Sequence, residues 1–470
     1  MACPMNMTDA EYRELQIAAV SHNNGTTYAE VQLQAIATYY VSVFRSRSRC
    51  PEAGVLTCQI LFSGPVSQKY LGNSNIRTIS EVGALLIGLI VSLTQPQYMP
   101  LWIAVNIVFV LLSSQRRIVD VLSATDKKQE KAIVEHFSRK RKSFVTVYRS
   151  TMLVVVLFCI LAVDFNIFER RFTKTETFGV STMDTGVGAF ILNNSIVTAS
   201  RPQKGGLLRI LKSSLPLVVL GLLRLLTVKS LDYQEHVSEY GVHWNFFFTL
   251  FFTGIVSNTV RALVKSTSAL FMFGLAIATA YQWVLDNYGG EQYILEHPRS
   301  SIIHANKEGV CSIVGYTALY LMGCGIGGHL SKDRYTKRAW TIAFAELAGL
   351  TMTMWLALTW LVDAEPSRRM MNLPYIIWAF ITTTSVLLLV FFVELFICDQ
   401  PVKESKLMLA INRNQLFLFL LGNLLTGLVN QTTRTNCASD ERAYTILIAY
   451  ICILMGLALG LHKLKLTLKL

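Results

Sequence analysis

Residues 151–188 read TMLVVVLFCILAVDFNIFERRFTKTETFGVSTMDTGVG, and this stretch indicates both how the chain is built and where its chemistry lies. An apolar run ends at Asp164, a cluster of charged residues follows, and a glycine-dotted apolar stretch then carries Asp184. Ionised groups at the mouth of a membrane-spanning helix are costly unless they pair, face a cavity or take part in chemistry. We therefore expect a functional site here.

The composition is that of a membrane protein. Of the 470 residues, 52% are hydrophobic and 16% are charged, and the mean hydropathy is +0.42, whereas soluble domains carry about 25% charged residues. The net charge of +13 does not indicate nucleic-acid binding, because the basic residues cluster in loops between apolar runs, as orientation signals do. The first 27 residues lack the basic and short apolar regions of a cleaved signal peptide.

We predict an all-α polytopic protein with about 13 membrane-spanning helices, because apolar windows of about 20 residues recur throughout the chain. The expected spans are 28–44, 80–95, 98–114, 150–168, 178–198, 208–227, 245–263, 266–286, 310–328, 339–361, 374–397, 414–430 and 444–461. A polar tail, 1–27, would precede a single membrane domain, 28–470. Within that domain, the basic stretch 115–149 is expected to form an amphipathic helix on the cytoplasmic membrane surface.

Two signals predict the same orientation, with the N-terminus lumenal and the C-terminus cytoplasmic. Most basic clusters then fall in cytoplasmic loops. Glycosylation sequons at Asn6, Asn24 and Asn430 fall on the lumenal side, and a fourth, at Asn193, lies within a span and should stay unmodified.

One predicted lumenal cluster, Arg170, Arg171 and Lys174, breaks this charge rule beside Asp164, as a functional cluster would. Asp164 and Lys174 are ten residues apart, roughly 15 Å along a helix, so they can meet only if the chain turns back near 169–173. Such a pair could accept a proton from a hydroxyl and stabilise developing negative charge. It could equally be a salt bridge that closes a helix end. The residues alone leave both interpretations open.

A second lumenal cluster lies in YQEHVSEYGVHWN, residues 233–245. On a helix, His236, Glu239 and His243 would share one face, which could hold a metal ion or present a base. Gly241 disfavours an uninterrupted helix. Hydrogen bonding to substrate and capping of a helix end by the polar side chains of this cluster are the alternatives.

The other polar groups have structural interpretations beside functional ones. Asn306 could cap a helix with Glu308 in its first turn, or Lys307 could contact a phosphate. Polar residues of span 414–430, including Asn423 and Asn430, are typical of bridges between helices.

The cysteines and the short motifs indicate no metal or cofactor. The nine cysteines are scattered singly without a CxxC pair, which fits neither a disulfide framework nor a zinc site. Nucleotide-binding, zinc-protease and serine-hydrolase motifs do not occur in the sequence.

Four segments carry a resemblance to a known family. They read AVDFNIFERRFTKTETFGVSTMDTGVGAF (162–190), YQEHVSEYGVHWNFFFTL (233–250), NKEGVCSIVGY (306–316) and NLLTGLVNQTTRTN (423–436). In these segments the chain resembles the inositol acyltransferases of glycosylphosphatidylinositol (GPI) anchor biosynthesis, the fungal wall transfer protein and its animal counterpart. One departure is Glu169, where the family pattern has proline before the double arginine.

The resemblance implies a multi-pass enzyme of the endoplasmic reticulum that moves a palmitoyl group from acyl-CoA to the inositol 2-hydroxyl of glucosaminyl-phosphatidylinositol. Acyl-CoA would be a co-substrate, and no metal or other cofactor is expected. The resemblance also implies that Asp164 and Lys174 are catalytic, and we expect the two to pair. The candidate substrate-binding residues are Arg170, Arg171, Asp184, His236, Glu239, His243, Asn245, Asn306 and Lys307.

Two other classes of function remain open at this point. A proton-coupled lipid or solute transporter would also place acidic, basic and histidine side chains at a membrane cavity. A non-catalytic assembly subunit would tolerate loss of the Asp164 carboxylate.

Overall fold

The computed structural model describes residues 7–47, 74–104, 127–139, 141–201, 207–230, 237–397 and 405–468. Over these residues the chain is helical, with 3-10 and π segments, turns and one isolated β-bridge between Thr26 and Val180 but no strand. The prediction of an all-α membrane protein is confirmed.

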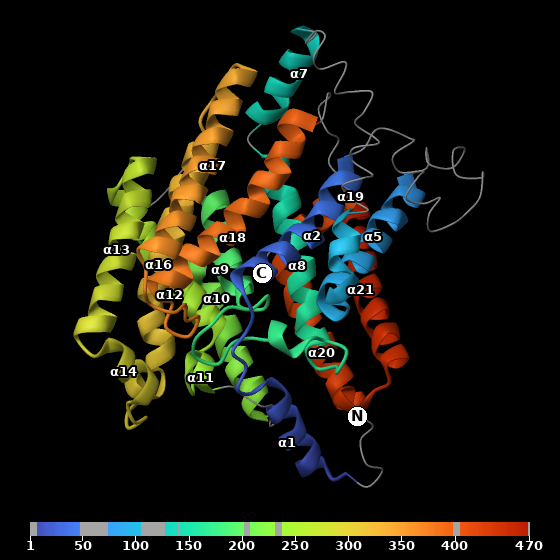
Figure 1. Ribbon diagram of the computed structural model, residues 1–470, viewed down its shortest axis with the longest axis vertical. Coiled ribbons are helices and arrows are strands. Elements are labelled where there is room, and N and C mark those ends of the chain that lie inside the picture. The colour runs from blue at the N-terminus through green and yellow to red at the C-terminus, as the bar shows by residue number, and fades with distance from the viewer. Residues whose placement is uncertain are drawn as a thin grey trace.

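Seven of the described helices are long and apolar enough to cross a membrane (Figure 1). They are α8 (Ser143–Ala162), α12 (Phe246–Leu263), α13 (Thr267–Asn287), α16 (Lys307–Leu330), α17 (Lys337–Trp360), α18 (Leu373–Phe392, continued to Phe396) and α21 (Asp440–Lys463). An eighth candidate is the pair Glu81–Thr94 and Pro96–Ala104, which is bent by 112°. The predicted turn between spans 80–95 and 98–114 is this bend, and residues 105–114 lie outside the described part.

Four further long helices match predicted spans but do not pass the same length and apolarity test. They are α2 (Tyr28–Arg47), α9 (Thr185–Ala199), α10 (Leu207–Ser230) and α20 (Gln415–Thr432). The count of thirteen spans and the orientation therefore stay predictions. Shorter helices and turns fill the connections: α1 (Asp9–Val20), α7 (Lys127–Ser138), α11 (Val237–Tyr240), α14 (Gly290–Glu296), α15 (Ile302–Ala305), α19 (Lys406–Arg413) and the 3-10 turn η2 (Arg170–Phe172).

The core consists of α8, α16 and α18. In each of these helices 78% of the apolar window is buried, against 22% to 33% for α12, α13, α17 and α21. Helices that are apolar all round belong inside a bundle or against lipid, and these percentages separate the two cases. The bundle thus has three inner helices and an outer layer that exposes apolar side chains.

Close packing around α16 depends on glycine. A Cβ atom at Gly323 would lie 1.9 Å from Ser195 Oγ of α9, and one at Gly274 of α13 would lie 2.6 Å from the Ala318 carbonyl oxygen of α16. Small residues let helix backbones approach closely in membranes. The contact between Gly323 of α16 and Ser195 of α9 holds α9 in the position where its N-terminal end meets the charged stretch after α8.

The starts of several helices are encoded by capping side chains. Ser266, Thr336, Asn372 and Ser439 each accept a hydrogen bond from a backbone N–H in the first turn of the helix that follows. Such caps satisfy donors that the helix itself leaves unpaired. The predicted span starts at 266, 339, 374 and 444 are within four residues of the observed ones for this reason.

Two predicted boundaries are wrong. The basic amphipathic segment does not extend to 149, because residues 143–149 are the first turns of the buried helix α8, and its amphipathic part within the described residues is α7. The span expected to start at 178 starts at Thr185. Residues 173–184 instead form a loop that long-range polar contacts hold in place.

The predicted polar tail contains α1 and packs on this loop. The amide of Asn23 donates to the Thr173 carbonyl oxygen (2.6 Å), and the backbone N–H of Thr26 donates to the Val180 carbonyl oxygen (2.8 Å). In Figure 1, α1, α11 and α14 lie at the lower end of the bundle and α7 lies at the upper end. Helix α11, which contains Glu239, therefore lies at the end of the bundle opposite α7.

One cysteine departs from the sequence expectation. Cys437 is disulfide-bonded, whereas Cys159, Cys311, Cys324 and Cys452 are free. Disulfides persist in oxidising compartments, and Cys437 is in the 431–443 loop that the sequence predicts to be lumenal.

Candidate active site

Asp164 lies in a tight turn directly after α8. The backbone N–H of Asp164 donates to the Leu161 carbonyl oxygen (3.2 Å), and that of Phe165 donates to the Ala162 carbonyl oxygen (3.0 Å). Arg170 folds back and donates from Nη1 to the Val163 carbonyl oxygen (2.8 Å). The predicted chain reversal near 169–173 is the 3-10 turn η2. Glu169, the residue directly before η2, has a φ of −61°, a value that proline also adopts.

The Asp164 carboxylate is half-buried and hydrogen-bonded by a distant side chain. Asn430 of α20 donates from Nδ2 to Asp164 Oδ2 at 2.8 Å. Burial raises the pKa of Asp164 to about 6, and the Asn430 hydrogen bond and the nearby Arg170 charge limit the rise. A carboxyl group with this pKa changes protonation near neutral pH, as a general base must.

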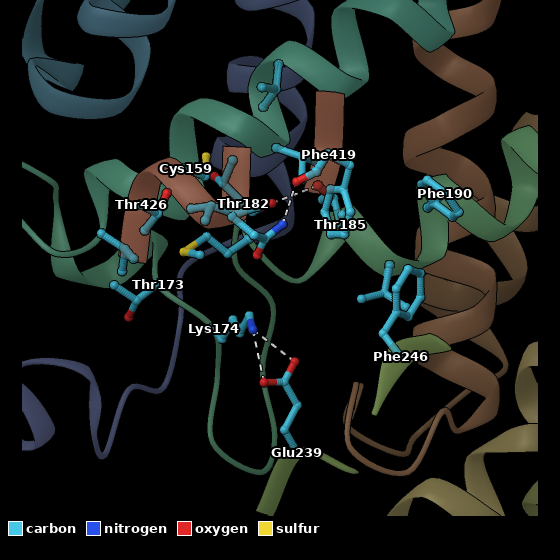
Figure 2. A pocket seen from close by; sticks show the side chains of 18 of the residues that line it. Cys159, Thr173, Lys174, Thr182, Thr185, Phe190, Glu239, Phe246, Phe419 and Thr426 are labelled. Carbon is cyan, nitrogen blue, oxygen red and sulfur yellow. Dashed lines mark hydrogen bonds and ion pairs between the residues drawn. The ribbon is translucent and has the colours of Figure 1, made fainter. Parts of the chain in front are cut away.

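The expected ion pair between Asp164 and Lys174 is not formed. Lys174 Nζ instead donates to both carboxylate oxygens of Glu239, at 2.9 and 3.0 Å (Figure 2). Glu239 comes from α11, so the pair joins the loop after α8 to the second predicted cluster. The physical reason is that the turn after α8 places Lys174 beside α11, whereas the Asp164 carboxylate accepts a hydrogen bond from Asn430.

Arg368 connects this pair to a second carboxylate. Its Nη1 donates to Glu239 Oε1 (2.9 Å) and its Nε donates to Asp184 Oδ1 (2.7 Å). Although burial acts in the opposite direction, the positive charges of Lys174 and Arg368 lower the pKa of Glu239 to about 2. Glu239 therefore stays ionised across the physiological range and holds both cations.

Asp184 is an anchor for the 173–184 loop. It is fully buried, and it accepts hydrogen bonds from the Thr175 backbone N–H (3.1 Å), the Thr175 hydroxyl (3.0 Å) and the Ser181 hydroxyl (2.8 Å). With Arg368 added, its oxygens have four donors. A buried carboxylate satisfied in this way holds the backbone in place, so its geometry gives Asp184 a structural task.

Apart from Asp184, which lies outside the lining, these groups line one cavity of about 1360 Å³ between the helices. Its polar wall includes Asp164, Lys174, Glu239 and Arg368, and Asn430 lies beside them. Its apolar wall includes Met152, Leu153 and Val156 of α8, Phe190 of α9, Val386 of α18 and Phe419 of α20. The α8 residues that line the cavity extend from Tyr148 to Ile160, which is about 18 Å along the helix axis. Figure 2 shows Phe190, Phe246 and Phe419 around the space above the Lys174–Glu239 pair.

Several predicted binding residues lie outside this lining. Arg171 pairs with Glu30 (3.2 Å). Asn306 begins α16 without a side-chain cap and its Oδ1 accepts from the His243 backbone N–H (2.7 Å), while Lys307 donates to the His297 carbonyl oxygen (2.6 Å). These contacts are structural, and they fix the connections at this end of the bundle.

Asn245 lines the cavity but has a capping contact. Its Oδ1 accepts from the Phe247 backbone N–H (3.0 Å) at the start of α12, and its Nδ2 donates to the Gly221 carbonyl oxygen (2.9 Å). His236 lies outside the described residues. Within the described part of the chain, no three His, Cys, Asp or Glu side chains are grouped as metal ligands.

The sequon at Asn430 needs a correction. Its amide nitrogen, the atom that a glycan would occupy, donates to Asp164 inside the cavity. A glycan on this nitrogen would have to occupy the cavity beside Asp164, so we expect Asn430 to stay unmodified. Asn430 is therefore part of the site. The bridge between helices expected for span 414–430 is the hydrogen bond from Asn430 to the Asp164 carboxylate.

Arg368 is the residue that the sequence analysis missed. It follows α17 in the loop before α18, on the side predicted to be lumenal, and Arg369 comes next to it. A double arginine on that side breaks the charge rule just as Arg170 and Arg171 do. Applied to every loop, the same signal would have pointed to Arg368.

Comparison with known proteins gives one family. Residues 12–461 match the family model described as GWT1. The chain is 37% identical over 374 residues to GPI-anchored wall transfer protein 1 of Yarrowia lipolytica, covering 73% of this chain and 77% of the relative. It is 30% identical over 522 residues to the phosphatidylinositol-glycan biosynthesis class W protein of Dictyostelium discoideum, covering 98% and 99% of the two chains.

Proposed function

This chain belongs to the GWT1 family, and we propose that its cavity transfers a long fatty acyl group from acyl-CoA to the inositol 2-hydroxyl of glucosaminyl-phosphatidylinositol. Proteins of this family are GPI inositol acyltransferases, so the chain is an acyltransferase of GPI-anchor biosynthesis. The observation that carries the proposed chemistry is a half-buried carboxylate of raised pKa in the same cavity wall as a lysine.

Asp164 is the general base of the proposed reaction. The ionised carboxylate accepts the proton of the inositol 2-hydroxyl while that oxygen attacks the thioester carbonyl carbon. The carbon–sulfur bond then breaks, the ester forms, and the proton passes to the departing CoA thiolate. A thioester is already an activated donor, so the step balances without a metal or a further cofactor.

Lys174 stabilises the negative charge that develops on the thioester carbonyl oxygen. An ammonium group has three donors, and the contacts to Glu239 leave capacity for a substrate oxygen. The Lys174 side chain is 42% exposed and lines the cavity, so a bound molecule can reach it. Glu239 and Arg368 act as positioning residues, because they fix the ammonium group before substrate arrives.

The setting of the reaction follows from the same proposal. The protein is a multi-pass membrane protein, and its acceptor is a membrane lipid. We place it in the endoplasmic reticulum, where the resemblance puts GPI-anchor assembly. Its co-substrate is a long-chain acyl-CoA, whose tail would occupy the apolar wall of the cavity.

The decisive experiment is acyl transfer by the purified protein in detergent or liposomes. Radiolabelled palmitoyl-CoA and glucosaminyl-phosphatidylinositol should give an alkali-sensitive acylated lipid. If the protein forms no such product but moves lipid or solute between liposome compartments without acyl-CoA, the transporter alternative replaces this proposal.

The pH dependence of transfer should report on Asp164. Because its pKa is raised to about 6, the carboxyl is protonated and inactive as a base below that pH. We expect kcat/KM to rise about tenfold per pH unit up to about pH 6 and then level off. Glu239 cannot cause this rise in kcat/KM, because its pKa is about 2.

Removing the Asn430 amide should shift the rise of kcat/KM with pH to higher pH. The hydrogen bond from Asn430 favours the ionised form of Asp164, and losing a charge-assisted bond of about 1.5 kcal/mol corresponds to about one pH unit. Asn423→Ala is the matched control, because Asn423 also lines the cavity but donates to Phe419 of its own helix. If the midpoint of the rise of kcat/KM with pH is unchanged in Asn430→Ala, Asp164 is not the group whose ionisation causes that rise.

The apolar wall predicts a selectivity variant. Gly186 lines the cavity near the start of α9, and a Cβ atom there would lie 3.6 Å from Val156, an ordinary contact. Gly186→Ala should therefore be tolerated, whereas Gly186→Leu should lower palmitoyl transfer by tenfold or more, about the effect of a methylene-scale clash. Octanoyl transfer should fall much less. Equal losses for both chain lengths would show that the tail lies elsewhere.

A further inference from the structure

Arg224 is a cation in an otherwise apolar stretch of α10. The sequence around it is LGLLRLLTV, residues 220–228. A charged side chain among leucines of a membrane helix is costly unless it faces a cavity or a polar partner. Arg224 lines the cavity that contains Lys174 and Glu239. No step of the proposed acyl transfer uses it.

The packing of α10 fixes the position of Arg224. Asn245 Nδ2 donates to the Gly221 carbonyl oxygen (2.9 Å), and a Cβ atom at Gly221 would lie 2.8 Å from the Phe248 ring of α12. Residue 224 comes three positions after Gly221, so it lies on the neighbouring turn of the helix. Helix α12 therefore holds the arginine at the edge of the cavity.

Exposed leucines line two walls of the cavity, α10 and α20. Leu223 of α10 is 51% exposed, and Leu424 and Leu428 of α20 are 71% and 56% exposed. Among the described residues, helix α10 packs chiefly on α12, whereas α20 packs chiefly on α8, and α10 and α20 do not pack extensively on each other. Two apolar cavity walls with this little mutual packing suit an opening towards the bilayer.

The chemistry of this opening fits one kind of molecule. Apolar flanks suit acyl chains, and a guanidinium at the edge suits a phosphate, which it can bind with two parallel hydrogen bonds. The positive charge of Arg224 contributes to the low pKa of Glu239, so the arginine lies near the Lys174–Glu239 pair. A phosphodiester at Arg224 would place the attached inositol beside the catalytic groups.

We propose that the acceptor phospholipid reaches the site sideways from the bilayer between α10 and α20, with its phosphodiester bound by Arg224. This assignment rests on the proposed acyltransferase function, and it names the binding site of the acceptor. The donor thioester would then use the remainder of the cavity.

Steady-state kinetics with both substrates tests the assignment. Arg224→Gln should raise the KM for glucosaminyl-phosphatidylinositol about tenfold or more, with the KM for palmitoyl-CoA and kcat nearly unchanged, and Arg224→Lys should be intermediate. Lys212→Gln is the control, because Lys212 is an exposed cation of the same helix outside the cavity lining. A rise in the KM for palmitoyl-CoA alone, or no change in either KM, would overturn the proposal.

A binding measurement keeps this test independent of turnover. Diazirine-labelled phosphatidylinositol in liposomes, without acyl-CoA, should crosslink to peptides of α10 and α20, and Arg224→Gln should reduce the yield severalfold. Crosslinking to these peptides without any acyl transfer would leave the lipid site standing and remove the proposed reaction. Crosslinking confined to other helices would remove the lipid site.

Discussion

Replacing Asp164 with asparagine is expected to lower kcat/KM for acyl transfer by about 10²- to 10⁴-fold, the range that general base catalysis contributes. The amide cannot accept the hydroxyl proton. Its oxygen can still accept the hydrogen bond from Asn430 Nδ2, which is 2.8 Å from the carboxylate in the native protein. The fold and the cavity should therefore remain, and palmitoyl-CoA should still bind.

The measurement is initial-rate acyl transfer beside thermal unfolding in the same detergent. Asp363→Asn is the matched control, because Asp363 is an exposed carboxylate outside the cavity lining, and it should keep full activity. If Asp164→Asn retains activity within threefold while unfolding at the native temperature, Asp164 is not the base. A loss of both activity and folding would instead make the residue structural.

The helical scaffold could be predicted from sequence because its signals are local. Apolar runs, capping residues such as Asn372 and Ser439, and small residues in α16 each act within a few positions of themselves. The prediction fails where contacts are distant. Residues 178–184 look apolar enough to begin a helix, yet Gly179 N–H donates to the Pro366 carbonyl oxygen (2.9 Å) and Asp184 binds Arg368.

Some of the cavity residues, such as Asp164 and Lys174, could be predicted from the sequence, but their partners could not. Their spacing allows them to meet only if the chain turns back between them; the chain does turn, and both residues line one cavity. Spacing does not say which distant helix supplies a partner. Lys174 binds Glu239, 65 positions away, and Asp164 binds Asn430, 266 positions away. Only the packing of α11 and α20 against the loop after α8 decides these contacts.

The largest effect on stability is expected from Arg368→Met. Arg368 is 6% exposed, and it is the cation that joins the buried carboxylate of Asp184 to the half-buried carboxylate of Glu239. Removing one partner of a buried ion pair leaves an uncompensated charge and typically costs about 3–5 kcal/mol. The unfolding temperature in detergent should fall clearly, and the 173–184 loop should become sensitive to proteolysis.

Arg369→Met is the matched control for this loss. Arg369 donates to Glu308 (2.8 Å), but Glu308 keeps two hydrogen bonds from Arg299, at 2.6 and 3.0 Å. Its removal leaves the carboxylate paired, so the cost should be smaller. Adding Asp184→Asn to Arg368→Met should recover part of the stability, because the amide removes the one carboxylate charge left unpaired, whereas Glu239 keeps Lys174. If Arg368→Met and Arg369→Met unfold at the same temperature, the Arg368 bridge does not hold the loop, and the position of Lys174 must depend on Glu239 alone.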